Sequence, residues 1–239
     1  DVIRITQECD FSDRATVDNI IDAIKANPGT SLHGSLPCTP WSQWMTMCIY
    51  MWGESGRAKI EKRRDLSRKM MLNFLECAKV AVQYGGEVSF EWPRYCSGWK
   101  EPTIIKMIHE LGMFSAKVDG CAVGVAHSET GIPIKKPWLF VTTCERQAIS
   151  LGALRCPHGS EFTHAECAGS QTKRTERYPD ALCRTYLASM FGFHHHCPIV
   201  SKKATTGATQ HRVKEVSYPD VHISPYMAGS SSYGCISKK

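Results

Sequence analysis

Apolar residues recur at every third or fourth position in several stretches of the chain, which is the spacing of an amphipathic helix. Residues 14–29 show this spacing and end in a Pro-Gly pair, a normal helix stop. Residues 56–86 form a longer stretch that is basic in its first half, apolar in its second and closed by two glycines. The same spacing predicts helices over residues 101–113, where a proline falls in the first turn, and over residues 178–193.

Shorter apolar runs lie between these helices and predict strands. Residues 2–6 alternate polar with apolar side chains, and residues 30–36 form a short apolar run before a proline. Further strands are expected in residues 87–93, 115–125 and 136–144. Strands that alternate with helices favour a parallel sheet, because each parallel crossover needs a long connection, usually a helix. We therefore expect an α/β fold with a mainly parallel, Rossmann-like sheet.

The pattern changes after residue 144, which divides the chain into three regions. Residues 1–144 form the expected α/β core, and residues 145–200 are rich in Cys, His and Gly before a closing helix. Residues 201–239 are Ser, Thr, Lys and Gly with isolated aromatics, so a flexible basic tail is expected there. With 42% hydrophobic and 22% charged residues, the chain of 239 residues has the composition of a folded globular protein.

Composition also indicates a compartment and a class of partner. The most apolar stretch, residues 44–53, is about half the length of a membrane-spanning helix, and the N-terminal residues do not resemble a signal peptide. A start without Met suggests a processed chain or a piece of a longer polypeptide. Twelve scattered cysteines indicate a reducing, intracellular compartment, nuclear or cytoplasmic, in which most thiols pack as small apolar groups. The formal charge of +6 permits a polyanionic partner such as nucleic acid.

Polar groups follow three of the expected strands. Cys38 follows the first, Glu91 ends the second, and the loop 121–127 follows the third. Ligands bind at the carboxyl ends of the strands in such sheets, so these groups are expected to converge in one cleft. A thiol and a carboxyl that share a pocket suit nucleophilic attack on an electron-poor ring, as in cytosine methylation at carbon 5. Two alternatives remain: Cys38 is a buried turn thiol, or it acts with His33 in a thiol-dependent hydrolase.

Three segments resemble DNA cytosine-C5 methyltransferases. The loop "SLPCTPWSQW" (residues 35–44) resembles the Pro-Cys loop of that family, with Trp41-Ser42 as its aromatic-Ser pair. The segment "FEWP" (residues 90–93) resembles the strand end that carries the family's Glu-Asn-Val. Residues 119–143 are similar to a later stretch in which a Gly-Val turn, a basic pair and an apolar strand follow one another. The order of the segments and their approximate spacing both match.

A narrower resemblance covers about residues 8–190: it is to methyltransferase-like segments in retroelement-type polyproteins of marine protists. These share a Cys-Thr-x-Trp-Ser turn, a Glu-x-Pro strand end, a Gly-x-Pro-x-Lys-Lys-Pro turn, a Cys/His patch and a "YPxxLC" helix. The resemblance implies a cytosine-C5 methyltransferase-like domain acting on DNA, in which Cys38 is the nucleophile and Glu91 contacts the base. It also implies that Lys135 and Lys136 lie near the substrate or its phosphates. Such an enzyme needs S-adenosylmethionine.

The chain departs from that family at the cofactor site. The family binds S-adenosylmethionine on an early Phe-x-Gly-x-Gly turn that is absent from this chain, and Thr39, Trp92 and Pro93 replace the usual Gln, Asn and Val. Another segment or chain is then expected to complete the sheet, since an exposed central strand edge promotes aggregation. The alternative function is a catalytically inactive, zinc-containing module of a mobile-element polyprotein that binds nucleic acid, with DNA favoured over RNA.

Cysteine and histidine gather in "CPHGSEFTHAEC" (residues 156–167). Two thiolates and two imidazoles can hold a tetrahedral zinc ion, and a short segment with little core gains most from such a site. The expected ligands are Cys156, His158, His164 and Cys167. Alternative ligands lie in "FGFHHHCP" (residues 191–198), namely His194, His195 or Cys197. The structural alternative is a loop with solvated histidines and buried cysteines.

Two further features suit contact with nucleic acid. The basic half of the helix over residues 56–86 could follow phosphates, or it is a solvated face with interleaved acidic partners. Trp41 and Trp44, with Ser42 beside them, could stack an unpaired base, or the two rings pack in the core.

Overall fold

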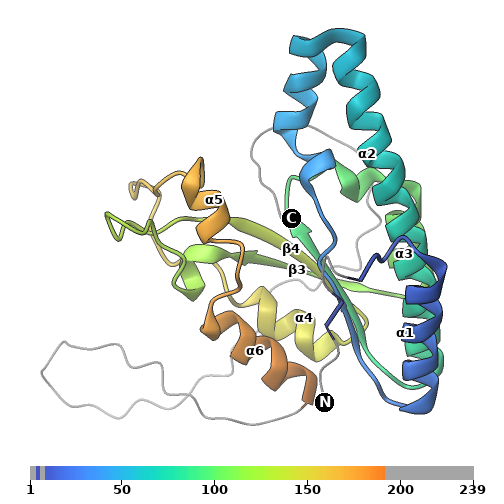
Figure 1. Ribbon diagram of the computed structural model, residues 1–239. Helices are drawn as coiled ribbons and strands as arrows, with labels where there is room; N and C mark the ends of the chain where they lie inside the picture. The colour runs from blue at the N-terminus through green and yellow to red at the C-terminus, as the bar shows by residue number, and fades with distance from the viewer. Residues whose placement is uncertain (1–3, 6–8, 192–239) are drawn as a thin grey trace, which may run out of the picture.

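The computed structural model describes residues 4–5 and 9–191 (Figure 1). Within this range the chain forms a four-stranded sheet with helices on both faces, so the expected α/β class is confirmed. Residues 4–5 are not in a strand. Three expectations lie outside the described residues: the rest of the strand at residues 2–6, the tail at residues 201–239, and the alternative ligands His194, His195 and Cys197.

The sheet is open and mixed. Its strands are β1 (Leu32–Gly34), β2 (Val88–Pro93), β3 (Phe114–Asp119) and β4 (Pro137–Thr142), in the order β1-β2-β4-β3. β1 pairs with β2 in parallel, whereas β4 is antiparallel to both β2 and β3, so β1, β2 and β3 point the same way. The expectation of a mainly parallel sheet is therefore corrected. Residues 120–136 connect β3 to β4 without a crossover helix, so the chain returns in the opposite direction.

Helices cover both faces of the sheet (Figure 1). On one side lie α1 (Arg14–Ala26), α2 (Gln43–Gln83) and α3 (Pro102–Glu110). On the other side lie α4 (Glu145–Gly152) and α6 (Asp180–Phe191), while the short α5 (Ser170–Arg174) belongs to the loop between them. Short 3-10 turns occupy Thr39–Trp41, Ser97–Lys100 and Gly120–Val123. No helix in the described part of the chain is both long and apolar enough to cross a membrane.

Both faces of the sheet are buried, and each has its own apolar cluster. Phe90 and Leu139 pack toward α1, α2 and α3, whereas Trp138 and Phe140 pack toward α4 and α6. The two clusters arise because successive side chains of β4 point to opposite faces. Burial on both faces explains why β4 has a continuous apolar run. In β2 apolar and polar residues alternate, and the polar Ser89 and Glu91 are buried on the α6 side.

The helix α2 begins at Gln43, well before the start expected at residue 56. Gly53 has φ 60° and ψ −151°, which divides α2 into two arms and gives the reversal at the top of Figure 1. The first arm exposes large apolar side chains: Trp44, Met47, Tyr50, Met51 and Trp52. A helix is recognised in a sequence by an apolar stripe that faces a core. These apolar side chains are exposed and do not form such a stripe, so their spacing did not predict a helix.

Gly86 lies between α2 and β2 and touches the chain that leads into β1. A Cβ atom on Gly86 would lie 1.9 Å from the backbone oxygen of Thr30, which cannot move aside as a flexible side chain can. We expect Gly86→Ala to lower the free energy of unfolding by about 1–3 kcal/mol. Gly152→Ala is the matched control, because a Cβ atom there meets nothing within 4 Å. Urea denaturation measures both variants, and equal losses would contradict this packing.

Candidate functional site

The carboxyl ends of β1, β2 and β3 lie along one edge of the sheet, where β4 begins. Arg94 directly follows β2, and its guanidinium donates to the carboxylate of Asp119 at the end of β3 over 2.9 Å. Cys121 comes two residues after that carboxylate. This edge therefore brings charged and metal-binding side chains together, as expected of strand ends.

Four side chains at this edge bring their metal-binding atoms within 4.8 Å of one another: Cys121, Cys156, His158 and His164. The Cys156 sulfur lies 3.4 Å from Nδ1 of His158 and 3.3 Å from Nε2 of His164. A sulfur and a nitrogen bound to one tetrahedral zinc ion, at about 2.3 Å and about 2.0 Å from it, lie about 3.5 Å apart. The group can therefore hold a metal ion.

Two of these ligands directly follow regular elements. Cys121 lies in the 3-10 turn after β3, which ends at Gly124 in the left-handed region with φ 89°. Cys156 follows α4, and its backbone N–H donates to the carboxylate of Asp119 over 3.1 Å. The two thiols are thus held at the same strand end, in hydrogen-bond contact with each other.

The two histidines flank an aromatic ring. The ring centroid of Phe162 lies 4.1 Å from that of His158, in a stacked arrangement, and 4.9 Å from that of His164, edge-on. The backbone N–H of Ala165 donates to the carbonyl of Pro133 over 2.9 Å, which fixes the end of this loop against the segment before β4. Packing on Phe162 therefore restricts the orientations of both imidazoles.

A metal ion at this site would have to displace a proton from Cys121 but not from His164. Burial, and then the neighbouring Cys156, raise the pKa of Cys121 to about 12, because a thiolate there is poorly solvated and lies beside another sulfur. Burial, and then the charges of His158 and Lys135, lower the pKa of His164 and so keep its imidazole neutral and able to bind a metal. A divalent cation would stabilise both thiolates, so the donor set fits a metal.

Asp119 supports the group from the end of β3. It is 1% exposed, and its carboxylate accepts hydrogen bonds from Arg94, Arg155 and the backbone N–H of Cys156. Burial raises the pKa of Asp119, but the hydrogen bond from Cys156 and the charges of Arg94 and Arg155 outweigh burial, so the pKa lies below its usual value. The carboxylate is therefore ionised at neutral pH and fixes the backbone of Cys156.

Cys167, expected as the fourth ligand, is not part of this group. Its sulfur lies 3.4 Å from Oγ1 of Thr175 instead. The bridge between Ile134 and Ala165 holds the loop just after the last histidine and directs the following residues away from the other ligands. Cys121 takes the place of Cys167. The one signal for Cys121 in the sequence was its position directly after a strand, in the loop 121–127.

Cys38 lies at the start of the turn after β1 and is 3% exposed. It belongs to the apolar cluster on the α2 side, together with Trp41 and Trp92. Burial raises the pKa of Cys96 well above its usual value, and the charges of Cys38 and Glu91 act in the same direction. The charges of Cys38 and Glu91 therefore both influence the pKa of the Cys96 thiol. The role of Cys38 as a nucleophile stays a prediction.

Glu91 is 1% exposed and lies between Phe90 and Trp92 in β2. Those two rings pack on the α2 side, so the side chain of Glu91 points to the α6 side. Its Oε2 accepts hydrogen bonds from Ser35 Oγ at 2.9 Å and from the hydroxyl of Tyr178. Burial, and then the charge of Glu91, raise the pKa of Tyr178 well above its usual value. A role for Glu91 in contacting a base stays a prediction.

His33, the partner of Cys38 in the hydrolase alternative, is exposed but contacts the same tyrosine as Glu91. Its Nδ1 lies 2.8 Å from Ser89 Oγ, and its Nε2 lies 3.4 Å from the hydroxyl of Tyr178. Two cavities of the described residues, one at α5 and one at the first arm of α2, are not lined by Cys38, Glu91 or His33. The hydrolase alternative stays a prediction.

Trp41 and Ser42 have structural contacts in the fold. Trp41 is 2% exposed and donates from Nε1 to Ser67 Oγ over 2.8 Å. The guanidinium carbons of Arg64 and Arg68 lie 5.1 and 5.2 Å from the centroid of its ring. Ser42 caps α2 by accepting a hydrogen bond from the backbone N–H three residues later. Stacking of a base on Trp41 would require these neighbours to move, and binding of nucleic acid by either residue stays a prediction.

The basic half of α2 has the acidic partners that the solvated-face alternative requires. Arg64 lies 2.8 Å from Glu61, and Arg68 lies 2.8 Å from Asp65 and 3.0 Å from Glu101. Other basic side chains of this half are exposed and form no ion pair within the described range: Lys59, Lys62 and Arg63. The pairing favours a solvated face for at least two of these arginines.

Lys135 and Lys136 differ in their surroundings. Lys136 is buried, and its Nζ donates to the backbone carbonyl of Thr175 and, over 3.0 Å, to the Thr175 hydroxyl. Its φ of 30° lies in the left-handed region, so the backbone there is strained for a residue with a side chain. Lys135 is exposed and close enough to influence the charge of His164. Contact of either lysine with phosphate stays a prediction.

Comparisons of the chain with protein-family models, with curated proteins and with solved structures found no significant match. Function is therefore inferred from the residues of the site.

Proposed function

We propose that this chain is a nucleic-acid-binding module whose fold is held together by one zinc ion. The proposed ligands are Cys121, Cys156, His158 and His164. The observation that supports the metal is the position of their four binding atoms, all within 4.8 Å of one another. Two thiolates and two imidazoles fill every position around a tetrahedral ion, which is typical of structural rather than catalytic zinc.

The loop between α4 and α6 is the part of the fold that gains most from a metal. Residues 153–179 are all described by the structure, and the one helix among them is the short α5. Most of their side chains are at least partly exposed. An unfolded chain has no preformed site, so the free energy of binding zinc adds to the free energy of folding. The loop would therefore be ordered by the metal rather than by an apolar core of its own.

Nucleic acid is the proposed partner for two reasons. The chain carries a formal charge of +6, which favours a polyanion. Its segments resemble those of DNA cytosine-C5 methyltransferases and of retroelement polyproteins, which favours DNA over RNA. Binding to phosphates requires only fold and charge, so it needs neither an accessible Cys38 nor a cofactor.

Cytosine-C5 methylation is the second candidate function. One observation favours it: three strands point the same way beside one reversed strand, as a Rossmann-like sheet allows. Cys38 would attack carbon 6 of an extruded cytosine, and Glu91 would stabilise the activated ring. Both residues are enclosed, and the chain has no Phe-x-Gly-x-Gly turn. S-adenosylmethionine therefore does not fit these residues alone, and another segment or chain beyond β1 would have to bind it.

Asp119→Asn is expected to weaken zinc binding by about 10–100-fold. The neutral amide pairs poorly with Arg94 and Arg155, so it no longer fixes the backbone of Cys156 beside the metal. Competition with a chromophoric zinc chelator measures the affinity. Asp65→Asn is the matched control, because that carboxylate lies on the exposed face of α2. If both variants bind zinc as tightly as the parent chain, Asp119 does not support the site.

Two measurements on the purified chain test the proposed function. Elemental analysis should find close to one zinc per chain, and less than about half an equivalent would contradict the metal site. The affinity for labelled DNA should fall as salt rises, with a slope set by the number of phosphates contacted. A chain that binds neither DNA nor RNA in a salt-dependent way contradicts the nucleic-acid partner.

Covalent trapping separates the two candidate functions. DNA with a fluorinated cytosine forms a stable adduct with a methyltransferase nucleophile when S-adenosylmethionine is bound. The proposed module forms no adduct, and calorimetry detects no binding of S-adenosylmethionine. An adduct that forms with the parent chain and disappears in Cys38→Ser would favour the methyltransferase instead.

A further inference from the structure

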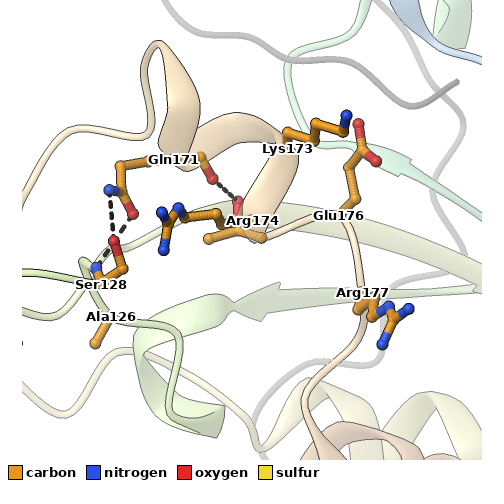
Figure 2. A pocket seen from close by; sticks show the side chains of 8 residues that line it. Ala126, Ser128, Gln171, Lys173, Arg174, Glu176 and Arg177 are labelled. Atoms are coloured by element: carbon orange, nitrogen blue, oxygen red, sulfur yellow. Dashed lines mark hydrogen bonds between the residues drawn. The ribbon is translucent and has the colours of Figure 1, made fainter.

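A cavity of about 580 Å³ opens between the loop after β3 and α5. Figure 2 shows its two walls: the loop at Ala126 and Ser128 on one side, and α5 with the chain that follows it on the other. Neither Cys38 nor Glu91 lines the cavity. Its lining is strongly basic.

Three cations line the cavity, and Glu176 is the one carboxylate among its lining residues. The cations are Lys173, Arg174 and Arg177, and all three are exposed. None of them forms an ion pair with a carboxylate in residues 9–191, in contrast to Arg64 and Arg68 of α2. Three cations outnumber the single carboxylate, so the lining has a net positive charge and an anion in the cavity would relieve the repulsion between the cations.

Hydrogen bonds hold both walls in place. Gln171 donates from Nε2 to Ser128 Oγ over 2.9 Å and accepts from the backbone N–H of Ser128 over 3.2 Å, so it joins the walls (Figure 2). The Thr175 hydroxyl donates to the carbonyl of Gln171 over 2.8 Å, and buried Lys136 donates to Thr175. Because the backbone of the cationic wall is fixed in this way, an anion would bind at a smaller entropic cost.

We infer that the cavity lined by Lys173, Arg174 and Arg177 binds the phosphodiester backbone of a nucleic acid. This inference rests on the proposed function and names the surface that carries it out. Arginine guanidinium groups match phosphate oxygens in a bidentate arrangement, and lysine adds a point charge. The lining residues include a single apolar side chain, Ala126, so the cavity has no anchor for an apolar peptide or a lipid tail.

The cavity depends on the metal loop. His164 directly precedes Ala165, whose backbone is bonded to the segment before β4, and the chain then runs into α5 and the cationic wall. Without zinc the loop would be held only by its hydrogen bonds to neighbouring segments, so the cations would be oriented less firmly. Removal of zinc by a chelator is therefore expected to weaken binding to nucleic acid as well as to destabilise the fold.

Two triple variants with the same change in charge test the inference. The cavity variant carries Lys173→Ala, Arg174→Ala and Arg177→Ala. The control carries Lys59→Ala, Lys62→Ala and Arg63→Ala on the exposed face of α2. Fluorescence anisotropy with labelled single-stranded and duplex DNA gives the affinity at several salt concentrations, and zinc content with circular dichroism verifies that each variant is folded.

The cavity variant should bind at least about ten-fold more weakly than the parent chain, with a salt slope reduced by about 2–3, whereas the control should change by less than about three-fold. Arg174→Glu alone should weaken binding in the same direction if the triple variant does not fold. Equal losses in the two triple variants, or a larger loss in the control, overturn the inference and leave the proposed function standing. A parent chain that binds no nucleic acid overturns the proposed function itself.

Discussion

Replacing Cys121 with serine is expected to leave the purified protein almost without zinc, whereas replacing Cys167 with serine is expected to leave one zinc per chain. Cys121 contributes one of four binding atoms within 4.8 Å of one another, but the sulfur of Cys167 lies beside Thr175. A structural zinc site contributes about 10–16 kcal/mol of apparent binding free energy, and the loss of a thiolate removes a large part of it.

Thermal unfolding should report the same difference. Cys121→Ser should lower the melting temperature by about 10 °C or more, because the free energy of zinc binding is also free energy of folding. Cys167→Ser should change the melting temperature only slightly, since its hydroxyl can keep the contact with Thr175. If Cys167→Ser loses zinc and Cys121→Ser keeps it, the ligand set proposed here is wrong.

Trp92→Ala is expected to lower the free energy of unfolding by about 3–5 kcal/mol. The indole is 1% exposed, its ring centroid lies 4.8 Å from that of Phe90, and its Nε1 donates to the carbonyl of Leu36 over 2.7 Å. Gly98 lies against the same ring, since a Cβ atom there would come within 2.4 Å of it. The substitution therefore leaves a cavity and an acceptor without its donor in the core between β2 and the turn after β1.

Trp44→Ala is the matched control for this prediction. Trp44 is 53% exposed on the first arm of α2, so its removal should change stability by no more than about 0.5 kcal/mol. Urea denaturation followed by circular dichroism measures both variants. Equal effects of the two substitutions would mean that Trp92 is not a central core residue.

Most regular elements were predictable from spacing, because they bury one face or one stripe of side chains. The helices expected at residues 14–29, 101–113 and 178–193 correspond to α1, α3 and α6. The first arm of α2 was missed because its apolar residues do not face the core. The spacing of residues 87–93 and 136–144 predicted β2 and β4, but not the reversed direction of β4, which depends on the absence of a crossover helix before it.

The candidate metal site was predictable in part. Cys156, His158 and His164 lie close together in the sequence, so a local motif revealed them. Cys121 comes from the end of β3, and only the fold brings it to the other three ligands. The buried surroundings of Trp41 and Lys136 were not predictable from the motifs that contain them, since burial depends on segments that are distant in the sequence.

X-ray absorption at the zinc edge of the purified chain tests the central claim most directly. Two sulfur neighbours at about 2.3 Å and two imidazole nitrogens at about 2.0 Å are expected in the parent chain, and the same four neighbours are expected in Cys167→Ser. A chain purified with zinc in the medium that shows no bound metal, or a metal with oxygen neighbours only, would contradict the account.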